Sequence, residues 1–179
     1  GYERTVSVID LNSFKEESRI DVAINLEKVR ADKRGNLWVS SRGDHNSESS
    51  QLVFIDSKTQ EVTDTVSVMV NSMWMDDDLL HVKSNGFSYI TGAWTAMYSI
   101  IDTNTRKVVA TQIVTDGTEK EFETPYGIMV HPTTKDIYIT DAGDYVTPGV
   151  LYCFDKDGKK KWDVRTGDIP AHFALLPKN

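Results

Sequence analysis

The sequence is poor in the side chains that disulfide frameworks and metal sites require. Cys153 is the one cysteine among 179 residues, so no disulfide can form within the chain. It lies in the apolar stretch VLYCFD, which indicates a buried hydrophobic position rather than a nucleophile. The histidines (His45, His81, His131 and His172) show no HxH or HExxH spacing. We therefore predict no metal site.

Long apolar runs and clusters of positive charge are missing too. No window approaches the roughly 18 consecutive apolar residues that a membrane-spanning helix needs. The formal net charge is −7, and the one basic run, Lys159 to Lys161, follows an Asp-Gly turn. Binding to phosphates requires clustered Lys and Arg. We therefore predict no nucleic-acid partner and no transmembrane segment in this chain.

Motifs for nucleotide binding and serine hydrolysis are also absent. The sequence contains no G-x-S-x-G, P-loop or G-x-G-x-x-G pattern, so we predict no catalytic residues and no cofactor. The segment DKDGKK, from Asp155, begins like a calcium loop but has Thr166 at the twelfth position, where Glu is required. A hairpin turn explains it better, and the same holds for the acidic run Asp76 to Asp78.

What the sequence does contain is a repeat. Four apolar alternations each end on an aspartate that enters a polar turn, at Asp10, Asp56, Asp102 and Asp155, with spacings of 46, 46 and 53 residues. A second alternating run follows each turn, and then a short apolar run enters another turn. The alternation has period two and is rich in β-branched and aromatic residues, which predicts an all-β chain.

Each repeat therefore predicts four strands in about 46 residues, which is typical of one blade of a β-propeller. A β-sandwich is the alternative, although it does not require this near-constant period. We expect four-stranded antiparallel blades in a single domain, 1–179. The predicted blades cover 5–24 (partial), 29–68, 73–114 and 128–165, and 172–179 starts or closes a further blade. Propellers need about 4–8 blades, so we expect a fragment of a longer ring, with a small ring or self-association of two copies as alternatives.

The loops predict where a ligand would bind. Minimal polar turns occupy one face of the predicted blades, whereas the loops 43–50, 85–95 and 142–149 and the link 115–127 occupy the other. Long loops on a rigid scaffold commonly carry function. The residues on this long-loop face that we predict to contact a ligand are Lys28, Arg42, Asp44, His45, Asn71, Tyr89, Trp94, Tyr126, Asp141, Asp144, Tyr145 and His172. Loop-stabilising roles remain the alternative for each of them.

One stretch illustrates the division between the faces. In YGIMVHPTTKDIYITDAGDY, His131 and Asp136 fall on the short-turn face, where they mark the end of a strand. Asp141 and Asp144 fall on the long-loop face. Two neighbouring carboxylates can support glycoside hydrolysis, but the sequence does not set their separation.

The segments TPYGIMVHPTTKDIYITD and LEKVRADKRGNLWVSS resemble the blade unit of the YncE-like/NHL-like β-propellers, in particular the surface-layer-like bacterial cell-envelope branch. This resemblance covers essentially the whole chain and implies export to the cell envelope or surface, often with an N-terminal lipid anchor that this chain does not contain. It implies rings of about seven blades and supplies no catalytic motif.

Three functions remain open from the sequence. The first is a non-enzymatic, exported module that binds a polar ligand, a glycan or a protein through the long-loop face. The second is a lyase or hydrolase that acts on a carbohydrate or lactone at the channel mouth, and the third is a structural scaffold of the envelope. A mixture of polar groups with aromatic faces on the long loops favours the first.

Overall fold

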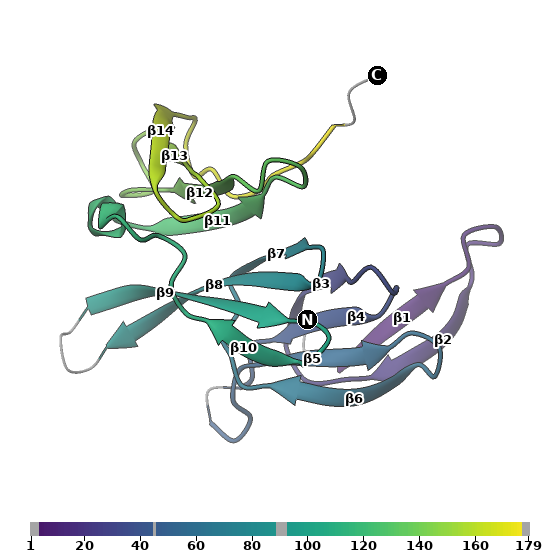
Figure 1. Ribbon diagram of the computed structural model, residues 1–179. Coiled ribbons are helices and arrows are strands. Elements are labelled where there is room, and N and C mark those ends of the chain that lie inside the picture. Colours follow the sequence, from purple (N-terminus) through teal and green to yellow (C-terminus); the bar gives the residue numbers. More distant parts are fainter. Residues whose placement is uncertain (1–3, 45, 89–92, 177–179) are drawn as a thin grey trace. The chain divides into compact units, whose positions relative to one another are not determined.

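The computed structural model describes residues 4–44, 46–88 and 93–176. Within these residues the chain forms fourteen strands and one short 3-10 helix, η1 (Thr118–Glu121) (Figure 1). Three sheets have four antiparallel strands each and a fourth has two. The predicted all-β class is therefore confirmed. The chain divides into two compact units, residues 1–70 and 71–179.

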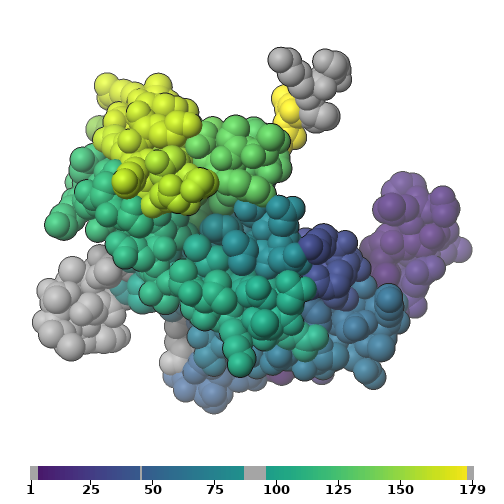
Figure 2. Space-filling view, in the orientation of Figure 1, coloured from purple at the N-terminus to yellow at the C-terminus, as the bar shows by residue number. Residues whose placement is uncertain are grey.

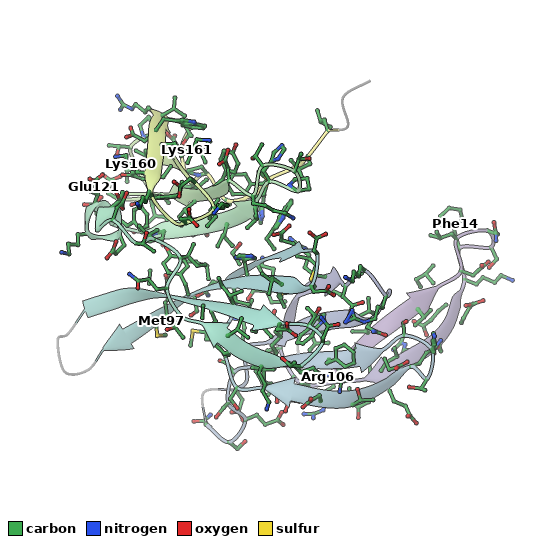
Figure 3. All side chains as sticks on the ribbon, in the orientation of Figure 1. Phe14, Met97, Arg106, Glu121, Lys160 and Lys161 are labelled. Atoms are coloured by element: carbon green, nitrogen blue, oxygen red, sulfur yellow. The ribbon has the colours of Figure 1, made fainter. Side chains whose placement is uncertain are left out.

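Unit 1 consists of a hairpin and a four-stranded sheet. The hairpin pairs β1 (Thr5–Ile9) with β2 (Glu16–Asp21), forms the purple lobe of Figure 2 and carries the exposed Phe14 near its tip (Figure 3). The sheet runs in sequential order through β3 (Leu26–Ala31), β4 (Leu37–Ser41), β5 (Gln51–Asp56) and β6 (Glu61–Val66).

The core of unit 1 joins the hairpin to the sheet. Ile20 of β2 and Ala23 pack in one buried cluster with Val39, Val53 and Ile55 of the sheet. Burying such side chains stabilises a fold by about 1.5–3 kcal/mol each. Successive side chains of a strand point to opposite faces, and Trp38, Leu52 and Phe54, on the other face of β4 and β5, are buried as well. Both faces of these two strands are therefore covered.

Unit 2 contains two four-stranded sheets, each in sequential order. The first consists of β7 (Ser72–Asp76), β8 (Leu79–Ser88), β9 (Ala93–Asp102) and β10 (Lys107–Ala110). The second consists of β11 (Pro125–Val130), β12 (Ile137–Asp141), β13 (Val150–Phe154) and β14 (Lys160–Arg165).

The two sheets of unit 2 share one core. Tyr98 from β9 packs in a buried cluster with Ile128, Ile139 and Phe154 from the second sheet. At the short-turn end Lys135 Nζ joins the sheets through ion pairs of 2.6 Å to Asp76 and 2.7 Å to Asp77. Figure 3 shows Glu121 close to Lys160 of β14, and their side chains are 3.1 Å apart.

The short turns are stabilised by side chains that accept hydrogen bonds from backbone N–H groups. In the turns that follow β1, β5, β9 and β13, Oδ1 of an aspartate accepts backbone N–H groups two to four residues further on. These are the aspartates that define the sequence repeat. His131 acts alike, because its Nδ1 accepts the N–H groups of Thr133 and Thr134 at 3.2 and 3.1 Å. Such local bonds are typical turn chemistry.

A β-bulge lies in the first strand of two of the four-stranded sheets. Two residues of β3 lie opposite Ser40 alone, and two residues of β11 lie opposite Thr140 alone. The hydroxyls of Ser40 and Thr140 accept the N–H groups of Lys28 (2.9 Å) and Gly127 (2.8 Å), the second residue of each bulge. In the third sheet β7 begins at Ser72, which pairs with Lys83, and the Asn71 N–H donates to the Lys83 carbonyl oxygen at 2.9 Å.

The strands depart from their predicted limits in two ways. β3 and β11 each begin three residues earlier than expected, because the residues before the bulge still pair with Ser41 and Asp141. The predicted loop 85–95 is largely strand, since β8 extends to Ser88 and β9 starts at Ala93. β-Branched and aromatic residues can continue a hairpin well beyond the sheet that supports it.

Candidate functional site

Arg42, one of the predicted binding residues of unit 1, lines a hollow at the long-loop end of its sheet. The loop between β4 and β5 and the segment that follows β6 enclose a volume of about 400 Å³. That volume lies within the range of small-ligand sites. The residues that line it are Arg42, Asn46, Glu48, Ser49, Ser50, Ser67, Val68 and Met69.

The charged groups at this hollow already have partners. Arg4 Nη1 donates to Glu48 Oε1 at 2.8 Å, and Arg42 Nε lies 3.8 Å from Glu27 Oε2. Glu27 also lies 3.6 Å from Nζ of Lys28, a predicted site residue whose own N–H is held in the bulge. The hollow thus offers hydroxyl and amide groups in a lining that contains one positive and one negative side chain.

Asp44 forms the loop rather than the surface of the hollow. Its Oδ1 accepts the N–H groups of Asn46, Ser47 and Glu48, each at 2.8 Å, and Ser47 Oγ donates to its Oδ2. The bonds from Glu48 and Asn46 are the main cause of a lowered pKa of the Asp44 carboxyl.

Asp144 does the same in unit 2. Its Oδ1 accepts the N–H groups of Val146 and Thr147 and the hydroxyl of Thr147, at 2.8 to 2.9 Å. In both loops a glycine in the left-handed region precedes the aspartate: Gly43 (φ 69°) and Gly143 (φ 53°). The pattern G-D-x-x-S/T recurs 100 residues apart. This pattern indicates an aspartate that binds the backbone of its own loop, a role that was not predicted for Asp44 and Asp144.

We expect Asp144→Ala to loosen the loop between β12 and β13. Amide exchange at Val146 and Thr147 should become roughly tenfold faster, because both N–H groups lose their acceptor. Asp144→Asn, which keeps an acceptor oxygen, is the matched control and should preserve most of the protection. Unchanged exchange at both amides in the alanine variant would contradict the assigned role. Hydrogen exchange followed by mass spectrometry measures this.

Tyr126 and Tyr145 form an aromatic pair at the long-loop end of the second sheet of unit 2. Their ring centroids lie 6.0 Å apart at 82°, and the residues are 36% and 49% exposed. Tyr126 is the first residue of the bulge in β11, and bulges commonly redirect a side chain. Tyr145 adopts φ 65° within the loop that Asp144 organises. The pair therefore presents aromatic surface to solvent from an ordered loop.

Asp141 is buried and holds the chain that precedes β11. Its Oδ2 accepts the N–H of Glu123 at 2.7 Å, and its Oδ1 accepts those of Thr124 (2.7 Å) and Gly143 (2.9 Å). The arrangement does not suit glycoside hydrolysis, because a general acid needs a raised pKa. The bonds from Thr147 and Val146 lower the pKa of the neighbouring Asp144 instead. A ligand contact by Asp141 stays a prediction.

His172 lies in a tail that crosses the second sheet of unit 2. A Cβ on Gly127 would lie 2.5 Å from the Ala171 carbonyl oxygen and 3.1 Å from Phe173. A Cβ on Gly149 would meet Pro170 at 2.7 Å. These close approaches show that the two glycines allow the tail to lie against the sheet, which explains their lack of a side chain.

Four predicted site residues remain: His45, Asn71, Tyr89 and Trp94. Asn71 supports the backbone, because its Oδ1 accepts the N–H of Asn85 at 2.6 Å. His45 and Tyr89 lie outside the described residues. Trp94 is part of β9, opposite Phe87, but its side chain is not described. The structure therefore brings together Arg42 and the Asp44 loop in unit 1, and Tyr126, Asp144 and Tyr145 in unit 2.

A buried polar group in unit 2 was not predicted at all. His81, Lys83 and Tyr98 are 5%, 1% and 8% exposed. Among the described residues, neither ring nitrogen of His81 has a hydrogen-bond partner. The Tyr98 hydroxyl has none either. Desolvation lowers the pKa of His81, and Lys135 adds to this while Asp76 opposes it. Desolvation, with a contribution from Asp141 and Glu119, raises the pKa of Tyr98.

Two further findings concern metals and membranes. In the part of the chain that the structure describes, no three His, Cys, Asp or Glu side chains gather as a metal site would require. The same residues contain no helix whose length and apolar character would allow it to cross a bilayer.

The fold is similar to that of solved protein structures. Neither protein-family models nor curated proteins match the sequence. Among solved structures, the chain is similar to Kuenenia stuttgartiensis hydrazine synthase, with a TM-score of 0.69 and 14% identity over 92% of this chain and 44% of that one. It is also similar to the Dos1 propeller, with a TM-score of 0.55 and 13% identity over 93% of this chain and 43% of that one.

These likenesses show the fold and nothing more, because the identities are low. The sheets of sequential antiparallel strands and the similarity to the Dos1 propeller identify a partial β-propeller. The chain spans less than half the length of these two solved proteins.

Proposed function

We propose that this partial β-propeller is a non-enzymatic module that binds an uncharged, hydroxyl-rich ligand, a glycan, at the long-loop ends of its sheets. The observation that carries the proposal is the hollow of about 400 Å³ between the loop 42–50 and residues 67–69 of unit 1. The volume lies within the range of small-ligand sites, and six of its eight lining residues are polar or charged.

The chemistry of the lining favours a neutral ligand. Arg42 and Glu48 lie near opposite charges, Glu27 and Arg4, so a charged ligand would have to compete with existing ion pairs. The serine hydroxyls and the Asn46 amide both donate and accept hydrogen bonds, which matches the hydroxyl groups of a sugar. Val68 and Met69 supply apolar contact for its carbon atoms.

The aromatic pair of unit 2 supports the same class of ligand. Tyr126 and Tyr145 are partly exposed and held by a bulge and an ordered loop. Tyrosine combines an apolar ring with a polar hydroxyl, a combination enriched at binding surfaces. We assign to this pair a second contact with an extended glycan or, for a protein ligand, with an exposed segment.

The proposal includes the identity and location of the whole protein. The resemblance of TPYGIMVHPTTKDIYITD to the YncE-like/NHL-like blade unit supports membership of that family and its bacterial cell-envelope branch. Export to the envelope or cell surface, a ring completed by further blades and a protein partner are part of this proposal. The lower limit of about four blades in known propellers supports the additional blades.

A glycan array with a hollow-filling variant tests the proposed function. We expect the wild-type chain to retain a subset of glycans, and Ser67→Trp, which places an indole in the hollow, to weaken that binding at least tenfold. Thr59→Trp adds the same side chain at the exposed turn between β5 and β6 and is the matched control. It should bind like the wild type.

Two outcomes would overturn the proposal. The first is that the folded wild-type chain retains no glycan on the array. The second is equal binding by the Ser67→Trp and Thr59→Trp variants, which would show that the hollow does not contact the ligand. Far-UV circular dichroism verifies that both variants keep the β-sheet content of the wild type.

A further inference from the structure

Lys83 occupies a position that the other four-stranded sheets give to a hydroxyl. In the second strand of each sheet, one residue pairs with the residue that precedes the repeat aspartate: Leu37 in β4, Ile137 in β12 and Leu80 in β8. Three residues after Leu37 and Ile137 lie Ser40 and Thr140. The same count from Leu80 leads to Lys83. Ser72, the first residue of β7, pairs with Lys83, and the Asn71 N–H donates to the Lys83 carbonyl oxygen at 2.9 Å. The side chain at position 83 has no hydroxyl and therefore does not have the role that Ser40 and Thr140 have.

The surroundings of Lys83 are buried and polar. Lys83 is 1% exposed and lies directly opposite Tyr98 on the neighbouring strand β9. Directly opposite side chains have Cβ atoms about 4.5–5.5 Å apart. The Tyr98 hydroxyl is also buried and has no hydrogen-bond partner among the described residues. His81, two residues before Lys83, lies on the same face of β8.

Burial keeps part of the Lys83 amine unprotonated near neutral pH. Desolvation lowers its pKa to about 8, and the nearby charge of Asp141 opposes this shift. At pH 7 about a tenth of such an amine is neutral, against well under a thousandth of an ordinary lysine. The neutral form is the nucleophile in lysine chemistry.

We propose that Lys83 is a reactive amine that forms an imine with a small, uncharged aldehyde or ketone, a site separate from the long-loop hollow. The lone pair of Nζ attacks the carbonyl carbon and gives a carbinolamine. The hydroxyl of Tyr98, opposite it, donates a hydrogen bond to the departing hydroxyl, and the two protons of the amine nitrogen leave with the carbonyl oxygen as water. The products are the imine and one water molecule, so no oxidant, reductant or cofactor takes part.

The fixed charges decide between a carbonyl compound and carbon dioxide as the electrophile. A carbamate would place a new negative charge close to Asp141, whose carboxylate is held by three backbone N–H groups. Imine formation passes through a positive iminium, which the negative charge of Asp141 stabilises. Because Lys83 is 1% exposed, a compound of two carbon atoms is the suitable probe.

Reductive alkylation of the wild-type chain tests this assignment. We treat the protein with acetaldehyde and cyanoborohydride at pH 7 and measure ethylation of each lysine by peptide mass spectrometry. Lys83 should react at least tenfold faster than the exposed Lys15, with a rate that rises with pH to a plateau above about 8. Lys135, which pairs with Asp76 and Asp77, serves as the ion-paired reference.

Variants and denaturant separate reactivity from mere exposure. Tyr98→Phe should slow ethylation of Lys83 about tenfold, because it removes one hydrogen-bond donor to the departing hydroxyl, and leave Lys15 unchanged. Unfolding in urea should abolish the preference for Lys83. Modification of Lys83 no faster than that of Lys15 in the folded chain, or an equal rate in the Tyr98→Phe variant, would overturn the proposal.

Discussion

Replacing Asp141 by alanine is expected to lower the free energy of unfolding by about 3 kcal/mol or more. Three backbone N–H groups, those of Glu123, Thr124 and Gly143, would lose their acceptor. A hydrogen bond to a charged group contributes about 1.5–3 kcal/mol, and an unsatisfied buried donor costs about 1–3 kcal/mol. Part of this penalty is relieved where water reaches the released chain. Urea unfolding followed by circular dichroism measures the loss.

Two variants show whether the loss comes from the hydrogen bonds. Asp141→Asn keeps one acceptor oxygen and should be destabilised less than the alanine variant. Asp168→Ala removes an exposed aspartate from the same unit and should change stability by less than about 0.5 kcal/mol. If Asp141→Ala unfolded at the same urea concentration as Asp168→Ala, the structural role of Asp141 would be wrong.

The stability of the wild-type chain relative to Lys83→Met is expected to rise by about 3 kcal/mol between pH 8 and pH 10.5. The pKa of Lys83 is lowered from its ordinary 10.5 to about 8, and each unit corresponds to about 1.4 kcal/mol. Within this window the unfolded chain binds more protons than the folded chain, so stability increases with pH. Below pH 8 both states are protonated, and the full cost of burying the charge remains.

Methionine has nearly the length of lysine without the charge, so the difference between the two proteins isolates the amine. Lys83→Met should be the more stable protein at pH 7, as replacing a buried charge often is. Lys15→Met, at an exposed position, is the matched control and should follow the wild type throughout. A constant difference between wild type and Lys83→Met from pH 7 to pH 10.5 would disprove the lowered pKa.

The repeat made the fold predictable. Aspartates at positions 10, 56, 102 and 155 end the third strand of a blade because their carboxylates form the turn that follows. The same physical cause therefore produces both the sequence period and the structural one. Strand limits were less predictable, because a bulge lets residues before it keep pairing and leaves no fixed mark in the sequence.

The position of the long loops was predictable from the sequence, but the role of each residue in them was not. Long loops do lie at one end of the sheets, and Arg42 lines a hollow there. Asp44 and Asp144, however, use their carboxylates to bind their own loops. The repeated G-D-x-x-S/T pattern distinguishes this role. By contrast, Lys83 within LLHVKS gives no sign that it faces Tyr98, because that depends on strand register.

The bulge of β3 and β11 also bears on how new chemistry can arise in a repeated fold. Where the first strand has its extra residue, Ser40 and Thr140 are bound to that strand and are hard to replace. In the first sheet of unit 2 the start of the first strand supplies a side-chain acceptor instead, because the Asn71 amide oxygen accepts the Asn85 N–H, and the same position holds a lysine. Moving a side-chain acceptor from the second strand to the start of the first therefore opens a buried position to variation. Evolution or design can use such a move to place a reactive group in a sheet while its strand pairing is kept.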